Sequence, residues 1–264
     1  MECRWIRTSQ VNLARLRKAS GGVAVLPLSS IESHGPHAPT GSDPLCLEHL
    51  LGLIEKQETV AILPQLPYSH VPDATRLPGA VHIDSDILIP LVENICDELH
   101  RNGFSKIVLL HGHGGNVPLH AMFAHRMLEK CKRYAVYSIQ PLPGMHDFYM
   151  GLMESKDTGH ACEMETSMNL VACPECVDLK KVKGRRFRAQ PHPAVGEALT
   201  PVEWTSRWPT MAVGEPGRAT RQKGEKILNE WARRVVGILR KIKKDKIVPR
   251  VMSQFARERQ SHRR

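Results

Sequence analysis

Long hydrophobic runs are absent from this sequence. Nowhere do 18 apolar residues follow one another, and the first 20 residues lack the apolar stretch of a secretory signal. We therefore expect a soluble, cytoplasmic protein with no membrane partner.

Cysteines are few and do not pair into a recognisable framework. There are seven, an odd number scattered along the chain, which excludes a disulfide-built fold and suits a reducing compartment. The Cys-Pro-Glu-Cys sequence at 173–176 has no second pair for zinc and no thioredoxin-like setting. We expect it to contribute two ordinary buried cysteines.

Aromatic residues are also scarce, at 5% of the chain, although the net charge is +10. Residues 180–264 contain 23 Lys and Arg against 7 Asp and Glu, whereas residues 1–179 carry a net −6. No aromatic-interleaved or helix-turn-helix pattern accompanies the basic half, so nucleic acid is not the expected partner. A basic nucleic-acid-binding or scaffold protein remains the non-enzymatic alternative.

Short apolar strands alternate with amphipathic helices along most of the chain. This alternation is typical of βαβ units and predicts an α/β fold, a single-domain three-layer αβα sandwich with a mostly parallel central sheet. We expect one domain over residues 1–245 and a basic tail, 246–264, that frays. Strands are predicted at 23–28, 60–64, 106–110 and 135–139, with helices at 44–56, 84–103, 117–132, after His160, and at 224–244. Residues 184–217 are expected to form an extended excursion or an active-site cover.

A stiff polar segment follows the first predicted strand. It contains Glu32, His34, His37 and Asp43 among glycines and prolines. Carboxylates and neutral imidazoles are ligands for Zn, Mn or Fe, and residues two apart in an extended chain face the same way. The alternative is a polar loop in which Asp43 caps a helix that begins at Pro44.

Two further clusters lie later in the chain. HGHGGN, residues 111–116, follows the third predicted strand and offers His113 beside glycines that let the backbone approach a ligand. A phosphate loop or a structural glycine turn is the alternative, but no P-loop or G-x-G-x-x-G pattern is present. In HACEMETS, residues 160–167, Glu163 and Glu165 lie 200° apart on a helix, so we expect at most one to enter a given site.

The ordered set ESHGPHAPTGSD, HGHGGN and HACEMETS resembles the motifs of the creatininase family of metal-dependent amidohydrolases. The resemblance covers nearly the whole chain and points to the H-G-G-N branch, since Gly115 stands where creatinine-cleaving members carry a glutamate. His111 and Cys162 depart from the family pattern, and Lys156 replaces a tryptophan of creatinine hydrolases. It implies that His160 and Glu165 are catalytic and that His37, Gly114, Gly115 and Asn116 contact the substrate or the ligands. The metal ligands that it implies are Glu32, His34, Asp43, His113 and Glu165.

The resemblance also implies an activity. Two divalent metal ions, of zinc, manganese or iron, would lower the pKa of a bridging water, and the resulting hydroxide would cleave a C–N bond of a small cyclic amide, formamide or related compound. Hydrolysis of a cyclic ketone and peptidase activity are alternatives within the family. A homo-oligomer, with a hexamer as one form, is the expected assembly, and a small molecule is the expected substrate.

Overall fold

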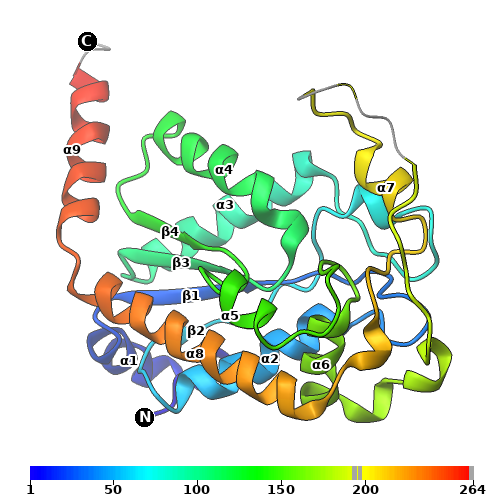
Figure 1. Ribbon diagram of the computed structural model, residues 1–264. Helices are drawn as coiled ribbons and strands as arrows, with labels where there is room; N and C mark the ends of the chain where they lie inside the picture. The colour runs from blue at the N-terminus through cyan, green and yellow to red at the C-terminus, as the bar shows by residue number, and fades with distance from the viewer. Residues whose placement is uncertain (192–194, 196–197, 262–264) are drawn as a thin grey trace.

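The centre of the computed structural model is a sheet of four parallel strands (Figure 1). The strands are β1 (Val23–Leu28), β2 (Ala61–Ile62), β3 (Lys106–His111) and β4 (Ala135–Ile139), in the order β2-β1-β3-β4. The structure describes residues 1–191, 195 and 198–261. Every residue of β1 and β3 is buried, as expected of central strands covered on both faces. β2 is shorter than the predicted 60–64 and has only two residues.

Helices cover both faces of the sheet (Figure 1). Alternate residues of β1 belong to two separate cores: Val23 and Val25 pack in one, and Ala24, Leu26 and Leu28 in the other. This alternation, together with the two helical layers, confirms the predicted three-layer αβα sandwich. The first core includes residues of α2 (Ser42–Glu55), α6 (Glu163–Ala172) and α8 (Arg221–Lys244), and the second includes residues of α3 (Ser85–Arg101) and α4 (Val117–Glu129).

Several shorter elements complete the described chain. No helix within the described ranges is both long and apolar enough to cross a membrane. The short α-helices are α1 (Leu13–Ala19), α5 (His146–Met150) and α7 (Glu203–Arg207). The 3-10 helices are η1 (Trp5–Arg7), η2 (Gln10–Asn12), η3 (Pro72–Ala74), η4 (Gly114–Asn116), η5 (Pro174–Cys176), η6 (Leu179–Val182) and η7 (Pro216–Arg218).

The basic C-terminal segment differs from the fraying tail that we expected. Residues Ile247–Ser261 form helix α9, and Ala256 is fully buried. Arg259 donates hydrogen bonds to the carbonyls of Leu128 and Glu129, at 2.9 and 3.0 Å. These carbonyls belong to the last turn of α4, and that of Leu128 also accepts the Cys131 N–H at 3.0 Å, so α9 adds a side-chain donor to the end of α4. Residues 262–264 of the expected tail lie outside the described residues.

The strand order creates a crevice between β1 and β3. The chain leaves β1 through α2 on one face of the sheet and leaves β3 through α4 on the other face. At such a switch point the loops after adjacent strands diverge, and ligands bind outside the carboxyl ends of the strands. The first two polar clusters of the sequence come directly after β1 and β3, so the topology brings them to this crevice.

Candidate metal centre and active site

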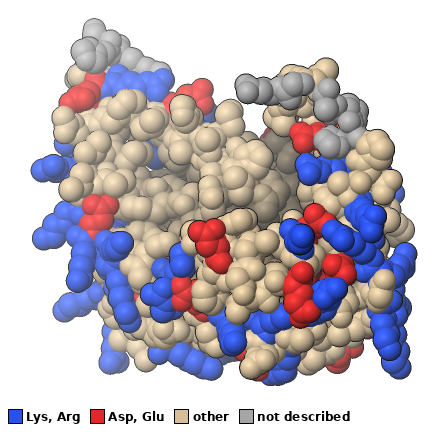
Figure 2. Space-filling view, in the orientation of Figure 1, with Lys and Arg blue, Asp and Glu red and all other residues tan. Residues whose placement is uncertain are grey.

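A cavity of about 610 Å³ opens at the crevice. The face drawn in Figure 2 is hollowed above the sheet, and the hollow is surrounded largely by uncharged residues. Its lining includes the predicted residues Glu32, His34, Asp43, His113 and Glu165. The five side chains that the sequence proposed as ligands therefore share one cavity, although 133 positions separate the first from the last.

The loop after β1 is held in shape by its own backbone. The N–H of Glu32 donates to the carbonyl of Thr40 at 3.0 Å, which closes the loop, and Gly35 adopts a φ of 68° that favours glycine. Asp43 lies inside the first turn of α2, because this helix begins at Ser42 and not at Pro44. Its carboxylate oxygens face imidazoles, so the capping alternative does not describe its contacts.

Asp43 connects two histidines. Its Oδ1 lies 3.2 Å from His34 Nε2, and its Oδ2 lies 2.9 Å from His113 Nδ1. His113 Nδ1 also lies 2.8 Å from Glu32 Oε1. All four residues are more than nine-tenths buried. A bridging carboxylate needs its two oxygens to face different partners. The two oxygens of Asp43 face different imidazoles, as this role requires.

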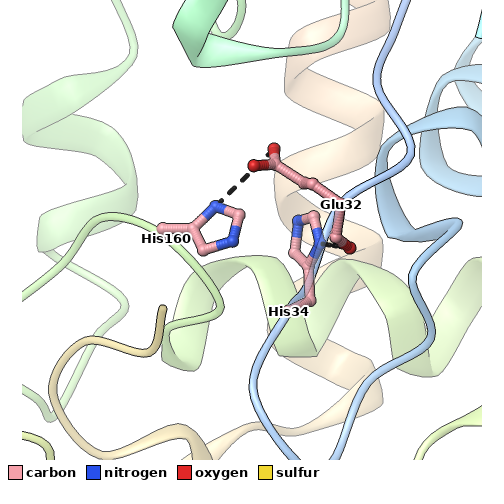
Figure 3. Close-up of side chains that lie close together, drawn as sticks. All are labelled: Glu32, His34 and His160. Carbon is pink, nitrogen blue, oxygen red and sulfur yellow. Dashed lines mark hydrogen bonds and ion pairs between the residues drawn. The ribbon is translucent and has the colours of Figure 1, made fainter. Parts of the chain in front are cut away.

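His160 and Glu165 approach the same centre from the third cluster. Figure 3 shows the His160 ring beside Glu32 and His34. The Nδ1 atom of His160 lies 4.0 Å from Glu32 Oε1, and its ring centroid lies 4.2 Å from that of His34. Glu165 Oε2 accepts a 2.6 Å hydrogen bond from the Ala161 N–H and lies 3.8 Å from His34 Nε2.

The tautomer of His160 is set by its backbone contact. Nε2 lies 2.6 Å from the carbonyl oxygen of Ser33, which can only accept a hydrogen bond, so Nε2 carries the donated proton. Nδ1 is then the atom that faces Glu32. The next residue, Ala161, has a φ of 49°, a left-handed conformation that is strained for a residue with a β-carbon and that is often found at functional sites.

The donor set fits divalent metal ions. Two groups of ligand atoms lie within 4.8 Å of one another: Glu32, His34 and His160 form one, and Glu32, Asp43 and His113 form the other. Glu32 Oε1, His34 Nε2 and His113 Nε2 are buried without a hydrogen-bond partner of good geometry among the described residues. Buried polar atoms without partners are costly, and a cation would satisfy them. The first group includes His160, for which the family resemblance implies a catalytic role.

The pKa values of these side chains report how strongly they interact. Burial lowers the pKa of His34, but Asp43, Glu165 and Glu32 outweigh it and raise that pKa to about 9. Burial likewise lowers the pKa of His113, and Glu32 and Asp43 raise it to about 10. Burial raises the pKa of the Glu165 carboxyl, which His160 and His34 only partly offset. The cavity thus holds concentrated negative charge that favours cations.

The other predicted site residues divide into two pairs. Gly114 and Gly115 line the cavity. His37 and Asn116 are buried beside it and are not among its lining residues. Nε2 of His37 lies 2.8 Å from the Thr166 hydroxyl, one residue after Glu165, and Asn116 Oδ1 accepts a hydrogen bond from Ser69. Their contacts are with the protein segments that position the site.

Several polar or aromatic residues that line the cavity were not identified from the sequence, among them His70, Asp73 and Trp204. His70 and Asp73 come from the loop after β2, and Trp204 comes from α7. His70 and Asp73 lie six and nine residues beyond the predicted strand 60–64 and form no polar cluster directly after it, and Trp204 lies in the excursion predicted at 184–217. The Cys-Pro-Glu-Cys expectation was half wrong, since Cys173 is buried but Cys176 is exposed.

With this geometry established, similarity to known proteins decides the family. Residues 8–239 match the family described as Creatininase: Creatinine amidohydrolase. The chain belongs to the creatininase family. The match covers most of the sequence and includes all three motifs that carry the resemblance.

Curated creatininase relatives differ in what they act on. Creatinine amidohydrolase of Pseudomonas putida is 24% identical over 253 residues, or 85% of this chain and 91% of that protein. The mycofactocin precursor peptide peptidase of Mycolicibacterium smegmatis is 26% identical over 79% of this chain and 80% of its own. The 3-dehydro-scyllo-inosose hydrolase of Thermotoga maritima is 24% identical over 65% of this chain, which spans only 57% of that relative's length.

Solved creatininases share the fold. A crystal structure of creatinine amidohydrolase superimposes with a TM-score of 0.79 at 21% identity, over 92% of this chain and 99% of that one. A variant creatininase described as Zn-Zn type gives 0.77 at 21% identity, over 93% and 100% of the two chains. A form described as creatininase Mn gives 0.75 at 20% identity over the same shares. At these identities the structures support the fold.

Proposed function

We propose that this protein is a metal-dependent amidohydrolase with a dinuclear centre, which cleaves a C–N bond of a small cyclic amide, formamide or related compound. One observation carries the proposal: two groups of ligand atoms, all on buried residues except the partly exposed His160, share Glu32 and face a cavity large enough for a small molecule. The expected ligands are Glu32, His34, Asp43, His113 and Glu165.

Divalent ions bound there would supply Lewis-acid activation of water and of the substrate carbonyl. The chain's own residues supply the rest. His160 holds a fixed orientation through Ser33, so its Nδ1 can hold a proton and deliver it to the leaving nitrogen. Glu165 is fixed by the Ala161 N–H, which places its carboxylate next to both His34 and the segment that carries His160.

The metal-site assignment is tested by metal analysis. Glu32→Gln and His113→Ala should each lose bound metal and turnover while keeping the fold, which far-UV circular dichroism would report. Glu98→Gln and His146→Ala are matched controls, because these residues are exposed and lie outside the cavity. Full metal occupancy in both site variants would contradict the assignment.

The substrate class is tested with a panel of compounds. Lactams, formamides and short peptides cover C–N bonds, and cyclic ketones cover the C–C alternative. Turnover of a lactam or formamide by the metal-loaded protein supports the proposal, whereas turnover confined to cyclic ketones or to peptides favours the corresponding alternative. If the protein is purified without metal and binds random DNA in a salt-sensitive way, the non-enzymatic alternative, a basic nucleic-acid-binding or scaffold protein, is favoured.

Assembly and location are part of the same proposal. The outward surfaces of α3 and α4 expose Ile87, Leu91 and Met122, apolar residues of the kind that subunit contacts cover. We expect a homo-oligomer, with a hexamer as one form, which sedimentation analysis would detect. The seven free cysteines suit the cytoplasm.

A further inference from the structure

One wall of the cavity carries polar groups that the proposed chemistry does not use. Asp73 and His70 both line the cavity, and both come from the loop between β2 and α3. No described residue hydrogen-bonds to the Asp73 carboxylate or pairs with it, and the buried Nδ1 of His70 also lacks a partner. Burial, followed by the charge of Glu32, raises the pKa of Asp73. A ligand that donates hydrogen bonds would relieve this cost.

Lysine and arginine side chains are missing from the described lining of the same cavity. Figure 2 shows most Lys and Arg of this face along its left, lower and right margins, whereas the surface of the hollow is tan. Arg76, three residues after Asp73, directs its guanidinium to the carbonyls of Thr205 and Trp208, at 2.6 and 3.4 Å. An anionic head group would therefore meet the Asp73 carboxylate in a lining without Lys or Arg, where the charges of His70, His113 and Arg76 only partly offset the raised pKa of Asp73.

The wall is rigid and lies beside the catalytic histidine. Val71 and Ala74 pack with Met211 and Trp204 in a small apolar cluster, so the loop after β2 is fastened to the segment around α7. Trp204 lines the cavity, and its ring lies 6.5 Å from that of His160 in an edge-on orientation at 87°. Trp204 thus connects the Asp73 wall with the reaction centre, and its aromatic ring can also interact with a bound cation.

We propose that Asp73 and His70 form a specificity wall that selects substrates with a nitrogen-rich group, cationic or neutral, away from the bond that is cleaved. Ammonium, amidine, guanidine and amide groups can donate N–H bonds to the Asp73 carboxylate, and to His70 Nδ1 in the tautomer that carries its proton on Nε2, whereas carboxylates and phosphates cannot. The claim that this group is part of a substrate rests on the proposed function. The claim that the wall binds such a group does not depend on it.

Binding of methylguanidinium to the purified, metal-containing protein tests the wall directly. Titration calorimetry should show binding to the wild type that weakens at least tenfold in Asp73→Asn. Asp86→Asn should bind as the wild type does, because Asp86 is an exposed aspartate on α3, outside the cavity. Acetate should not compete at the wall. His70→Phe keeps an aromatic ring and should weaken binding to a smaller degree.

Three outcomes would overturn the inference: no binding to the wild type, equal binding to wild type and Asp73→Asn, or loss of metal from Asp73→Asn. The last would make Asp73 a metal ligand. Thermal unfolding of each variant shows whether it remains folded. Failure of the proposed function is distinguishable, because a protein that binds methylguanidinium through Asp73 yet hydrolyses no compound of the panel refutes the reaction and leaves the wall in place.

Discussion

Gly115 lies directly against the imidazole of His113. A β-carbon built on Gly115 would collide with His113 Nε2, an atom that is buried without a hydrogen-bond partner. The absence of a side chain at Gly115 is therefore a steric requirement of the proposed metal centre. The neighbouring Gly114 faces open space, where a β-carbon would meet nothing within 4 Å.

Gly115→Ala should displace His113 and weaken metal binding by about 10- to 100-fold, the range seen when groups supporting a metal ligand are changed. Competition with a metal indicator would measure the change. Gly114→Ala is the matched control and should bind metal as the wild type does, because its added methyl group meets no neighbour. Equal affinities for all three proteins would show that His113 does not need this space.

Replacing His160 should separate catalysis from metal binding. We expect His160→Ala to keep its metal while kcat falls by about 10²- to 10⁴-fold, the usual contribution of a general acid or base. Steady-state kinetics on an identified amide, with metal analysis of the same sample, would measure both. Loss of metal together with kcat would instead place His160 among the ligands, as its position near Glu32 and His34 also permits.

Glu163 supports the fold, whereas Glu165, two residues later, lines the cavity. It is fully buried, and it accepts hydrogen bonds from the N–H groups of Glu154 and Ser155 and from Lys223. These contacts hold the start of the segment that leads to His160. Glu163→Gln should lower the free energy of unfolding by about 3 kcal/mol, because it leaves the Lys223 ammonium without its buried partner.

Urea denaturation would measure this loss. Glu154→Gln is the control, since Glu154 is an exposed partner of the same lysine and its loss should leave the midpoint unchanged. A midpoint for Glu163→Gln equal to that of the wild type would show that the buried network does not support this part of the fold.

Metal uptake should release protons at neutral pH. The pKa values of about 9 for His34 and about 10 for His113 mean that both imidazoles are protonated at pH 7 when metal is absent, whereas a ligand must be neutral. Calorimetry in buffers of different ionisation enthalpy should detect up to two protons released, and affinity should rise with pH up to about 10. Identical heats in all buffers would contradict this.

The same shifts predict how the metal-free protein responds to pH. Both folded-state pKa values lie above the unfolded value of about 6.5, so the protonated imidazoles stabilise the fold fully below pH 6.5. This contribution is lost as the pH rises through about 9 to 10. The Tm of the metal-free protein should fall over that interval, and a Tm that rises there would contradict the ion pairs with Asp43 and Glu32.

Much of this architecture could be predicted because local signals agreed with the fold. The runs at 23–28 and 106–110 are apolar nearly throughout, as buried central strands require, and the polar residues after them meet because adjacent parallel strands end at one edge. Helix α2 begins two residues earlier than expected, since Pro44 is tolerated throughout the first turn and marks a helix start only approximately.

The features that could not be predicted depend on contacts between distant segments. The sequence of α9 looks like a charged tail, and its helix is held against α4 by the hydrogen bonds that Arg259 donates to the last carbonyls of α4. Asp73 lies in η3 and Trp204 in α7, helices too short to leave a periodic pattern in the sequence, and packing around Met211 brings the two segments together. The exposure of Cys176 likewise results from the position of η5 at the surface.

The residues proposed for reactivity and those proposed for selectivity lie on separate pieces of chain. The proposed ligands come after β1 and β3 or lie in the first turns of α2 and α6, whereas the loop after β2 and the region of α7 bear the outer wall. A chimera that exchanges residues 69–77 for the corresponding loop of another creatininase could thus alter substrate choice without rebuilding the reaction centre. Such modularity would let one chemical core serve compounds as unlike as a lactam and a sugar-derived ketone.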